Sequence, residues 1–206
     1  MLKDHSPWLD YFRVSICSNG LAYWNKEVQD YFKKYKHFIN FSVSIDGNKE
    51  LHDACRVDLA GNPTYEKAIS AVKHYRKHYG TLNETKMTVS PNNVNYLYKA
   101  LINLINEDYK YIHCNCIFEE GWEYSHATIL YNELKKVADY ILDNNLNTKI
   151  YIRFFNENSF IPLEEDNENW CGGVCRESTS DKIPAIKYDG QIFPCIRYMN
   201  SSLNNK

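Results

Sequence analysis

The sequence predicts an α/β fold with a parallel sheet, and three observations support it. Short β-prone runs alternate with segments whose apolar residues recur at helical spacing. Turn-forming residues such as Gly, Asn, Asp and Pro follow several of these runs. The stretch between successive runs has room for a helix of ordinary length, which is the pattern of strand–helix–strand units with right-handed crossovers. Such units form either an open sheet or a barrel.

Each element follows from a local pattern. The predicted strands are β-prone runs at Tyr11–Cys17, Phe41–Ile45, Lys86–Ser90, Tyr109–Phe118 and Lys149–Phe155. The predicted helices have apolar residues three or four positions apart, within Asn25–Phe38, Tyr65–Tyr79, Leu97–Ile105 and Leu130–Ile141. Further on, Ile186–Phe193 predicts a β-hairpin with Asp189-Gly190 as a tight two-residue turn.

Composition limits the class of protein. With 206 residues the chain can build one sizeable core and a small appendage. A formal net charge of -2 gives no basic field for nucleic acid, so we expect no nucleic-acid partner. No apolar stretch is typical of a signal peptide or a membrane span, so we expect a cytoplasmic protein without membrane contact. Seven cysteines, an odd number, favour metal or iron–sulfur ligands over a disulfide framework.

Polar turns are expected at the carboxyl ends of the strands, where parallel α/β folds bind ligands. These turns are Ser18-Asn19-Gly20, Ser44-Ile45-Asp46-Gly47, Pro91-Asn92-Asn93 and Glu119-Glu120. Taken singly, each is explained by ordinary turn chemistry, because Asn, Asp and Gly supply left-handed backbone and local hydrogen bonds. Their order along the chain carries more information than any one of them.

Ser44-Ile45-Asp46-Gly47, followed by Leu51-His52-Asp53, Arg56 and Gly61, resembles the middle of a radical S-adenosylmethionine (SAM) enzyme. Cys171-Gly172-Gly173 and Pro194-Cys195-Ile196-Arg197-Tyr198 resemble the tail of the sulfatase-maturase and peptide-maturase branch, which carries a SPASM extension. Within it, the group acting on ribosomally made peptides, including cysteine-repeat targets, is the most similar. The resemblance implies a (β/α) radical SAM barrel, SAM and 4Fe-4S clusters as cofactors, and a peptide or protein substrate.

The sequence also departs from that family. Its members bind the SAM-cleaving cluster through a C-x3-C-x2-C triplet after the first barrel strand, and this sequence has no such triplet. The first strand here resembles the family's third. We therefore expect residues 1–160 to form a partial barrel without its first two strand–helix units, and residues 161–206 a truncated SPASM-like extension. Cys114 and Cys116 are expected on opposite sides of their strand, one as an apolar filler of the core.

The resemblance assigns Ser44 and Arg56 to the carboxylate of the SAM methionine moiety. A guanidinium can take a carboxylate in a two-pronged hydrogen bond, and a serine hydroxyl adds a donor. Without the resemblance, Ser44 is a strand residue and Arg56 a solvated surface charge. Asp46 and Gly47 are expected to shape the turn, and His52-Asp53 to form an Asx-type turn or helix start. No catalytic residue is assigned.

The resemblance also assigns Cys171, Cys175 and Cys195 to an auxiliary iron–sulfur cluster. The hairpin before Cys195 would return that thiol toward Cys171. A zinc ribbon is the competing interpretation, since thiolates on a knuckle and a hairpin suit tetrahedral zinc equally well, but such a site ordinarily needs a fourth ligand. The sequence shows no second close pair.

Three functions are consistent with these patterns. The chain is part of a radical SAM peptide-modifying enzyme whose missing motif is on a separate N-terminal fragment or lost, a noncatalytic remnant that binds peptide or an iron–sulfur cluster, or a zinc-stabilised α/β protein. A barrel without its first strands leaves a free edge at Tyr11–Cys17, so we expect poor solubility or self-association when the chain is made alone.

Overall fold

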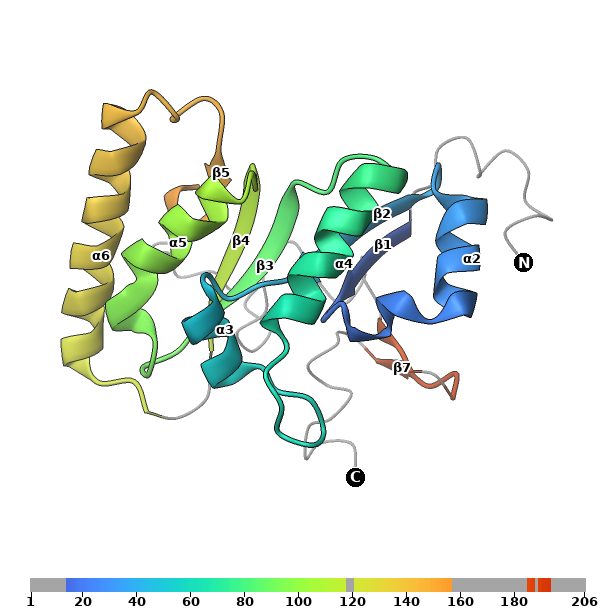
Figure 1. Cartoon of the computed structure of the whole chain (residues 1–206). Coiled ribbons are helices and arrows are strands. Elements are labelled where there is room, and N and C mark those ends of the chain that lie inside the picture. Colours follow the sequence, from blue (N-terminus) through green and yellow to red (C-terminus); the bar gives the residue numbers. More distant parts are fainter. Residues whose placement is uncertain (1–13, 118–120, 157–184, 188, 194–206) are drawn as a thin grey trace. The chain divides into compact units, whose positions relative to one another are not determined.

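The computed structural model describes residues 14–117, 121–156, 185–187 and 189–193. Its main feature is a five-stranded parallel sheet in which the strand order follows the sequence (Figure 1). The strands are β1 (Val14–Ser18), β2 (Ile39–Ser44), β3 (Glu84–Val89), β4 (Tyr111–Cys116) and β5 (Tyr151–Ile152). The parallel α/β architecture predicted from the sequence is confirmed.

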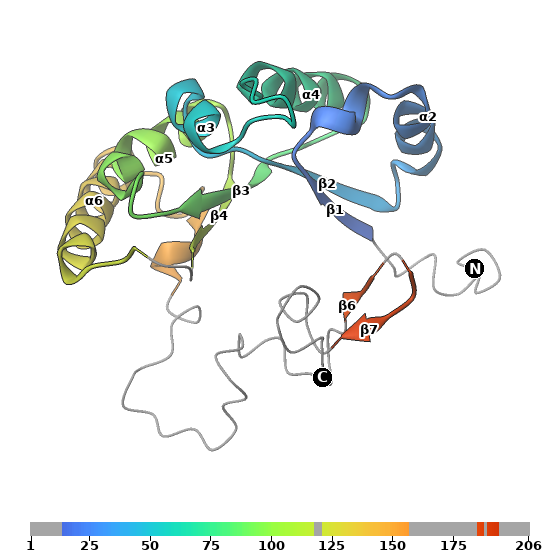
Figure 2. The ribbon, with the colours of Figure 1, turned by 90° about the horizontal axis from the view of Figure 1, so that it is seen from below.

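The helices of the crossovers lie on one face of this sheet (Figure 2). They are α2 (Lys26–Tyr35), α3 (Lys49–Cys55), α4 (Tyr65–His78), α5 (Leu97–Asn106) and α6 (Tyr124–Asp143). Because each strand pairs with the next one along the chain, every right-handed crossover returns on the same side. The other face of the sheet carries no helix in the part of the chain that the structure describes.

The hydrophobic core fills the space between the helices and the sheet. Phe41, Val43, Met87 and Ile112 extend from the strands into it and are nearly fully buried. The helices add apolar side chains at helical spacing, among them Ile69, Val72, Leu101, Leu104 and Val137. Strand side chains alternate between faces, so the residues between these core positions lie on the uncovered face.

Two elements differ from the sequence prediction. Lys49–Cys55 forms the short helix α3, which begins after Asn48, whose side-chain oxygen accepts a hydrogen bond from the Leu51 backbone N–H at 3.3 Å. A helix of seven residues is too short to show a clear apolar period. The last predicted strand ends at Ile152, because Arg153–Phe155 turns into a 3-10 helix (η4).

The predicted hairpin is present, but its loop begins one residue earlier. Strands β6 (Ala185–Ile186) and β7 (Ile192–Phe193) pair antiparallel. The Gly190 backbone N–H donates to the Lys187 carbonyl at 2.9 Å, and the Lys187 N–H donates to the Gln191 carbonyl at 2.8 Å. With Gly190 at φ 88°, this is a three-residue loop with a left-handed glycine in place of the predicted two-residue turn.

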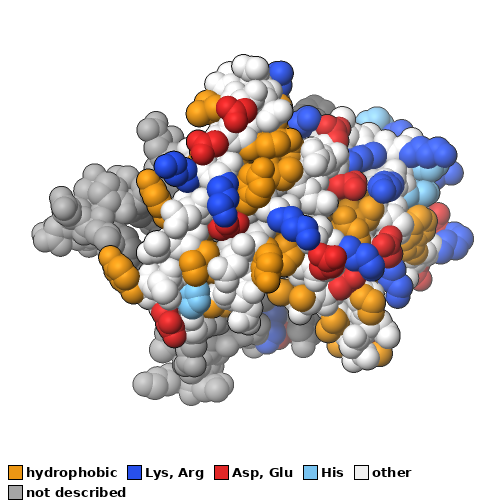
Figure 3. All heavy atoms as spheres, turned by 60° about the vertical axis from the view of Figure 1, so that its left-hand side comes forward, with side chains coloured by type: hydrophobic (Ala, Val, Ile, Leu, Met, Phe, Trp, Pro, Cys, Tyr) orange, Lys and Arg blue, Asp and Glu red, His pale blue; other side chains and the backbone are white. Residues whose placement is uncertain are grey.

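The chain divides into two compact units, Met1–Phe160 and Ile161–Lys206. The sheet and its helices belong to the first unit and the hairpin to the second. Among the described residues no helix is both long and apolar enough to cross a bilayer. On the face seen in Figure 3, basic and acidic side chains are interspersed with apolar ones, so neither sign of charge forms a continuous field there.

Among the described residues strand β1 forms one edge of the sheet, and an apolar pocket lies beside it. The pocket measures about 370 Å³ and its walls include Ile16, Val28, Tyr31 and Phe32. Phe32 is buried, whereas the Tyr31 side chain on the same helix remains 45% exposed. An outer strand next to apolar surface is a ready template for pairing with another chain.

We therefore expect the isolated chain to self-associate as its concentration rises, and Tyr31→Lys to weaken that association by placing a charge on the pocket wall. Sedimentation velocity over a range of concentrations measures it. Tyr131→Lys, at another exposed tyrosine on α6, is the matched control and is expected to behave like the wild type. A monodisperse wild-type monomer would contradict the prediction.

Candidate functional site

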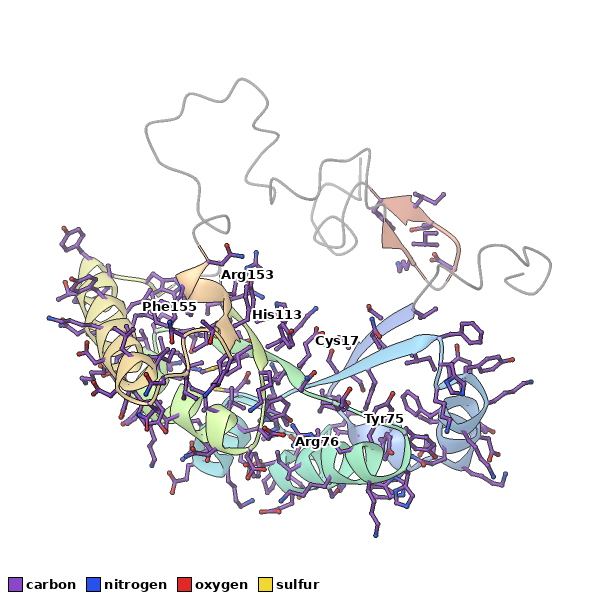
Figure 4. The ribbon with its side chains drawn as sticks, turned by 90° about the horizontal axis from the view of Figure 1, so that it is seen from above. Cys17, Tyr75, Arg76, His113, Arg153 and Phe155 are labelled. Atoms are coloured by element: carbon purple, nitrogen blue, oxygen red, sulfur yellow. The ribbon has the colours of Figure 1, made fainter. Side chains whose placement is uncertain are left out.

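The uncovered face of the sheet is polar along its whole width. Cys17 on β1 pairs in register with Ser42 on β2, and Ser44 pairs with Lys86 on β3. Lys86 in turn pairs with His113 on β4. In Figure 4, Cys17, His113 and Arg153 lie on this side, and Tyr75 and Arg76 of α4 on the other. A parallel sheet buried on both faces has apolar runs instead, so this face is built to meet solvent or a ligand.

Cys114 and Cys116 both lie on the helix-covered face, which corrects the expectation that they point to opposite sides. Side chains two positions apart in a strand share a face. Cys114 is buried in the core and Cys116 packs partly buried against it. Burial raises the pKa of both thiols, so they stay protonated and unreactive at neutral pH.

Ser44 lies where β2 ends, on the uncovered face. Its Oγ is 3.6 Å from the Cys17 Sγ at the end of the neighbouring strand. The hydroxyl is partly exposed, and this weak contact with sulfur leaves most of its hydrogen-bonding capacity unused among the described residues. Ser44 is therefore available to donate to a ligand placed over the carboxyl ends of β1 and β2.

Arg56 lies at the C-terminal end of α3, and its guanidinium binds Asp46 instead of projecting into solvent. The Arg56 Nε donates to Asp46 Oδ2 at 2.5 Å and Nη2 donates to Oδ1 at 3.1 Å. The Asp46 side chain is 2% exposed and that of Arg56 27%. Asp46 Oδ1 also accepts from the Thr88 backbone N–H at 2.9 Å. This two-pronged ion pair joins the turn after β2 to α3 and β3, and the interpretation of Arg56 as a solvated surface charge is wrong.

Gly47 shapes the turn after β2, as the sequence predicted. Its φ of 90° is in the left-handed region, which L side chains rarely adopt. A Cβ built on Gly47 would lie 2.5 Å from the Ala100 Cβ and 2.7 Å from its Cα. Glycine therefore allows helix α5 to pack directly against the loop that carries Asp46.

His52 is buried and holds the same loop from behind. The Asp46 backbone N–H donates to His52 Nδ1 at 3.3 Å, so the ring proton lies on Nε2, 3.2 Å from Thr64 Oγ1. Thr64 Oγ1 in turn donates to the Arg56 carbonyl at 2.7 Å. Burial lowers the pKa of His52, and the charge of Arg56 lowers it further against the opposing effect of Asp46. A neutral, fully bonded imidazole positions the loop and is not a ligand site.

Asp53 is part of helix α3 and caps the next helix instead of starting its own. Its Oδ1 accepts from the backbone N–H groups of Thr64 and Tyr65 at 2.9 and 2.8 Å. These are orphan donors at the start of α4, where a carboxylate is favourable. The predicted Asx-type turn at His52-Asp53 is thus replaced by two separate structural roles.

The His52 network predicts a pH dependence of stability. Because the folded pKa of His52 is lower than that of the unfolded chain, about 6.5, the unfolded state binds the proton more readily below that pH. The free energy of unfolding should therefore fall as the pH drops from about 6.5 toward the folded pKa. Urea titrations at several pH values measure this, and His52→Asn should flatten the dependence. The exposed His37→Asn is the control; equal slopes in both variants would contradict the prediction.

The three cysteines assigned to the auxiliary cluster, Cys171, Cys175 and Cys195, lie outside the described residues. Glu119-Glu120 does too. Within residues 14–117, 121–156 and the hairpin, no group of three or more His, Cys, Asp or Glu side chains is placed to hold a metal ion. The metal assignment stays a prediction from the sequence.

Sequence reasoning missed Lys86, His113 and Arg153, which lie level with Ser44 across the uncovered face. The signal was present in the alternation of polar and apolar residues within each strand, as in Lys86-Met87-Thr88 and His113-Cys114-Asn115. This alternation with a period of two residues indicates that one face of the sheet is not covered by helices.

The chain is similar in sequence to cysteine-type anaerobic sulfatase-maturating enzymes of two Clostridium perfringens strains. It is 26% identical to one over an alignment of 166 residues, and the match covers 76% of this chain and 43% of the relative. To the other it is 25% identical over 166 residues, with the same coverage. The chain thus spans less than half the length of these relatives. No family model matches the sequence.

The fold is also similar to that of several solved structures. One is described as a histidine-tagged anSMEcpe with bound AdoMet, with a TM-score of 0.66 and 23% identity, covering 89% of this chain and 48% of that one. Another, native anSMEcpe with bound AdoMet and Cp18Cys peptide, has a TM-score of 0.64 at 21% identity and covers 89% of this chain and 51% of that one. These similarities confirm the resemblance to sulfatase maturases and the partial barrel fold that the sequence predicted.

Proposed function

We propose that the chain is part of a radical SAM iron–sulfur enzyme that modifies a ribosomally made peptide or protein. The observation that carries the proposal is the polar uncovered face, on a sheet that matches part of AdoMet-bound structures. That face ends at Ser44 and at the loop holding Arg56, the residues that the resemblance assigns to SAM. One of the similar structures also contains a bound peptide, which supports a peptide substrate.

The residues present fit a SAM carboxylate in part. Nε and Nη2 of Arg56 are committed to Asp46. A SAM carboxylate would therefore be held by a single contact through Nη1 in place of the expected two-pronged one, with the Ser44 hydroxyl as a second donor. Asp46 would fix the guanidinium plane, and Ser44 would help to orient the carboxylate. Bound SAM would supply the radical that abstracts a hydrogen atom from the peptide.

The proposed activity needs a C-x3-C-x2-C motif, which this sequence does not contain. The outer edge of β1 and the apolar pocket of Ile16, Val28, Tyr31 and Phe32 have room for it, because a further strand–helix unit there would continue the sheet and cover the pocket. A parallel strand in such a unit would have its carboxyl end at the same edge of the sheet as Ser44. Cys171, Cys175 and Cys195 are proposed as ligands of an auxiliary 4Fe-4S cluster in residues 161–206, and a cytoplasmic location provides the reducing conditions that free thiols need.

Anaerobic reconstitution with iron and sulfide tests the cluster. We expect the intact chain to retain both, and the Cys171→Ala, Cys195→Ala double variant to lose them. Cys55→Ala, at an exposed cysteine in the first unit, is the matched control and should keep its iron. Zinc without iron would favour a zinc-stabilised protein, and neither metal would favour a noncatalytic remnant.

Binding of SAM to the reconstituted chain tests the site on the sheet. Equilibrium dialysis is expected to show weaker binding for Ser44→Ala, by about tenfold if one charge-assisted hydrogen bond is lost. Ser70→Ala removes a hydroxyl of α4 that bonds the Lys67 carbonyl, and it serves as the control. Equal affinity in the two variants would remove Ser44 from the site.

A further inference from the structure

Three basic side chains form a row across the uncovered face. Lys86 on β3 pairs in register with His113 on β4. Arg153 directly follows Ile152, whose register partner Ile112 directly precedes His113, so Arg153 lies level with His113 on the next strand. Figure 4 shows His113 and Arg153 on the same side of the sheet. Neighbouring strands are about 4.8 Å apart, so the row spans about 10 Å.

The charges in this row are only partly balanced. His113 Nε2 lies 3.5 Å from the Glu84 carboxylate, and its ring is 5.7 Å from that of Tyr151. Arg153 Nη1 donates to Asn115 Oδ1 at 2.9 Å, a neutral partner that orients the guanidinium. Lys86 is exposed and has no acidic partner within 4.0 Å among the described residues. With His113 neutral, Lys86 and Arg153 outweigh Glu84 by one positive charge.

The pKa of His113 depends on its burial and on the charged side chains around it. Burial lowers its pKa, and Lys86 and Arg153 lower it further, while Glu84 acts in the opposite direction. The register places both cations beside His113, which is why their charges disfavour its protonation. A negative group placed beside the ring would reverse their effect and raise its pKa.

We propose that Lys86, His113 and Arg153 form a subsite for a carboxylate, and that its occupant is an aspartate or glutamate side chain of the peptide substrate. This rests on the proposed function, which supplies the peptide. Lys86 and Arg153 contact the carboxylate from the two sides, and protonated His113, on the strand between them, donates a hydrogen bond to it. Charge-assisted bonds of this kind are about twice as strong as neutral ones.

The size and charge of the row favour one carboxylate over a larger polyanion. A nucleic-acid backbone needs an extended basic surface, whereas this row holds a single uncompensated charge and the whole chain has a net charge of -2. Glu84 lies beside His113 and balances one of the two cations, so the charge that remains matches a single carboxylate. The subsite would therefore select for an acidic residue in the peptide.

The test compares two capped pentapeptides, Ac-Ala-Ala-Glu-Ala-Ala-NH2 and its glutamine analogue, bound to the reconstituted chain. Histidine side-chain NMR resonances, with His113 assigned through His113→Asn, report binding. We expect the glutamate peptide to bind about tenfold more tightly and to raise the pKa of His113. Lys86→Met and Arg153→Met should each remove most of this preference. Lys99→Met, which removes the same charge from α5, should keep it.

Equal affinity for the two peptides would overturn the subsite. The subsite would also be overturned if SAM displaced the glutamate peptide and produced the same shift in the pKa of His113. The carboxylate bound there would then be that of SAM. Cluster content and SAM binding are measured on the same samples. If both are present without a glutamate preference, the subsite is wrong and the proposed function stands. If the preference persists without a cluster or SAM binding, the proposed function fails and the subsite stands.

Discussion

Gly47→Ala is expected to lower the free energy of unfolding by about 3 kcal/mol, the sum of left-handed strain and overpacking. The new Cβ would lie 2.7 Å from the Ala100 Cα, which is backbone of α5 and cannot turn aside. Relief requires α5 and the loop to separate, and the Asn103 side chain would then lose its 3.3 Å hydrogen bond to the Gly47 carbonyl. Chemical denaturation monitored by circular dichroism measures the change.

Gly61→Ala separates the two causes. Gly61 has a φ of 81°, close to that of Gly47, but a Cβ there would meet nothing within 4 Å. Gly61→Ala should lower the free energy of unfolding by about 1 kcal/mol, from backbone strain alone. If both variants are destabilised equally, the close approach of α5 is not what requires glycine at position 47.

Arg56→Met is expected to destabilise the fold by about 3 kcal/mol, because it leaves the buried Asp46 carboxylate without its charged partner. Asp46 would keep the Thr88 N–H, which is insufficient for a carboxylate that is 2% exposed. Asp46→Asn tests the pair from the other side and is also expected to be destabilising, since it turns one acceptor into a donor facing the guanidinium. Urea denaturation measures both.

Lys49→Met is the matched control, since it breaks the ion pair with Asp53 on the surface of the same helix. Lys49 is 51% exposed, and such pairs contribute about 1 kcal/mol or less. If Arg56→Met lowers the free energy of unfolding no more than Lys49→Met does, the Asp46 carboxylate does not need the guanidinium as its partner. Nε and Nη2 of Arg56 would then be available to a ligand carboxylate, as the resemblance implies.

The sequence was sufficient for the regular part of the fold. Four long helices and five strands each carry a local period, and sequential strand pairing follows from the crossover rule. Helix α3 was missed because the contacts that stabilise its seven residues leave no hydrophobic period in the sequence. These contacts are the Asn48 cap and the hydrogen bonds from the Thr64 and Tyr65 N–H groups to Asp53. The error at Cys114 and Cys116 came from misreading a period that the sequence displays.

The site was less predictable than the fold, because its contacts join residues far apart in sequence. Asp46 and Arg56 look like an ordinary turn aspartate and a surface arginine until the end of α3 brings them together. Lys86, His113 and Arg153 come from three strands, and only the register between those strands aligns them. The motif resemblance assigned Ser44 and Arg56 to the site but gave no information about which donors of the Arg56 guanidinium are already engaged.

The sequential order of the strands also bears on how the chain folds during synthesis. Within the part of the chain that the structure describes, strands β1 to β5 pair with their neighbours in sequence, so none of these five waits for a distant partner to emerge from the ribosome. Each new strand–helix unit can add to a sheet that is already formed, and domains fold in this direction as synthesis proceeds. The loop-closure entropy of each step is that of one crossover, and it does not grow with the number of units already in place.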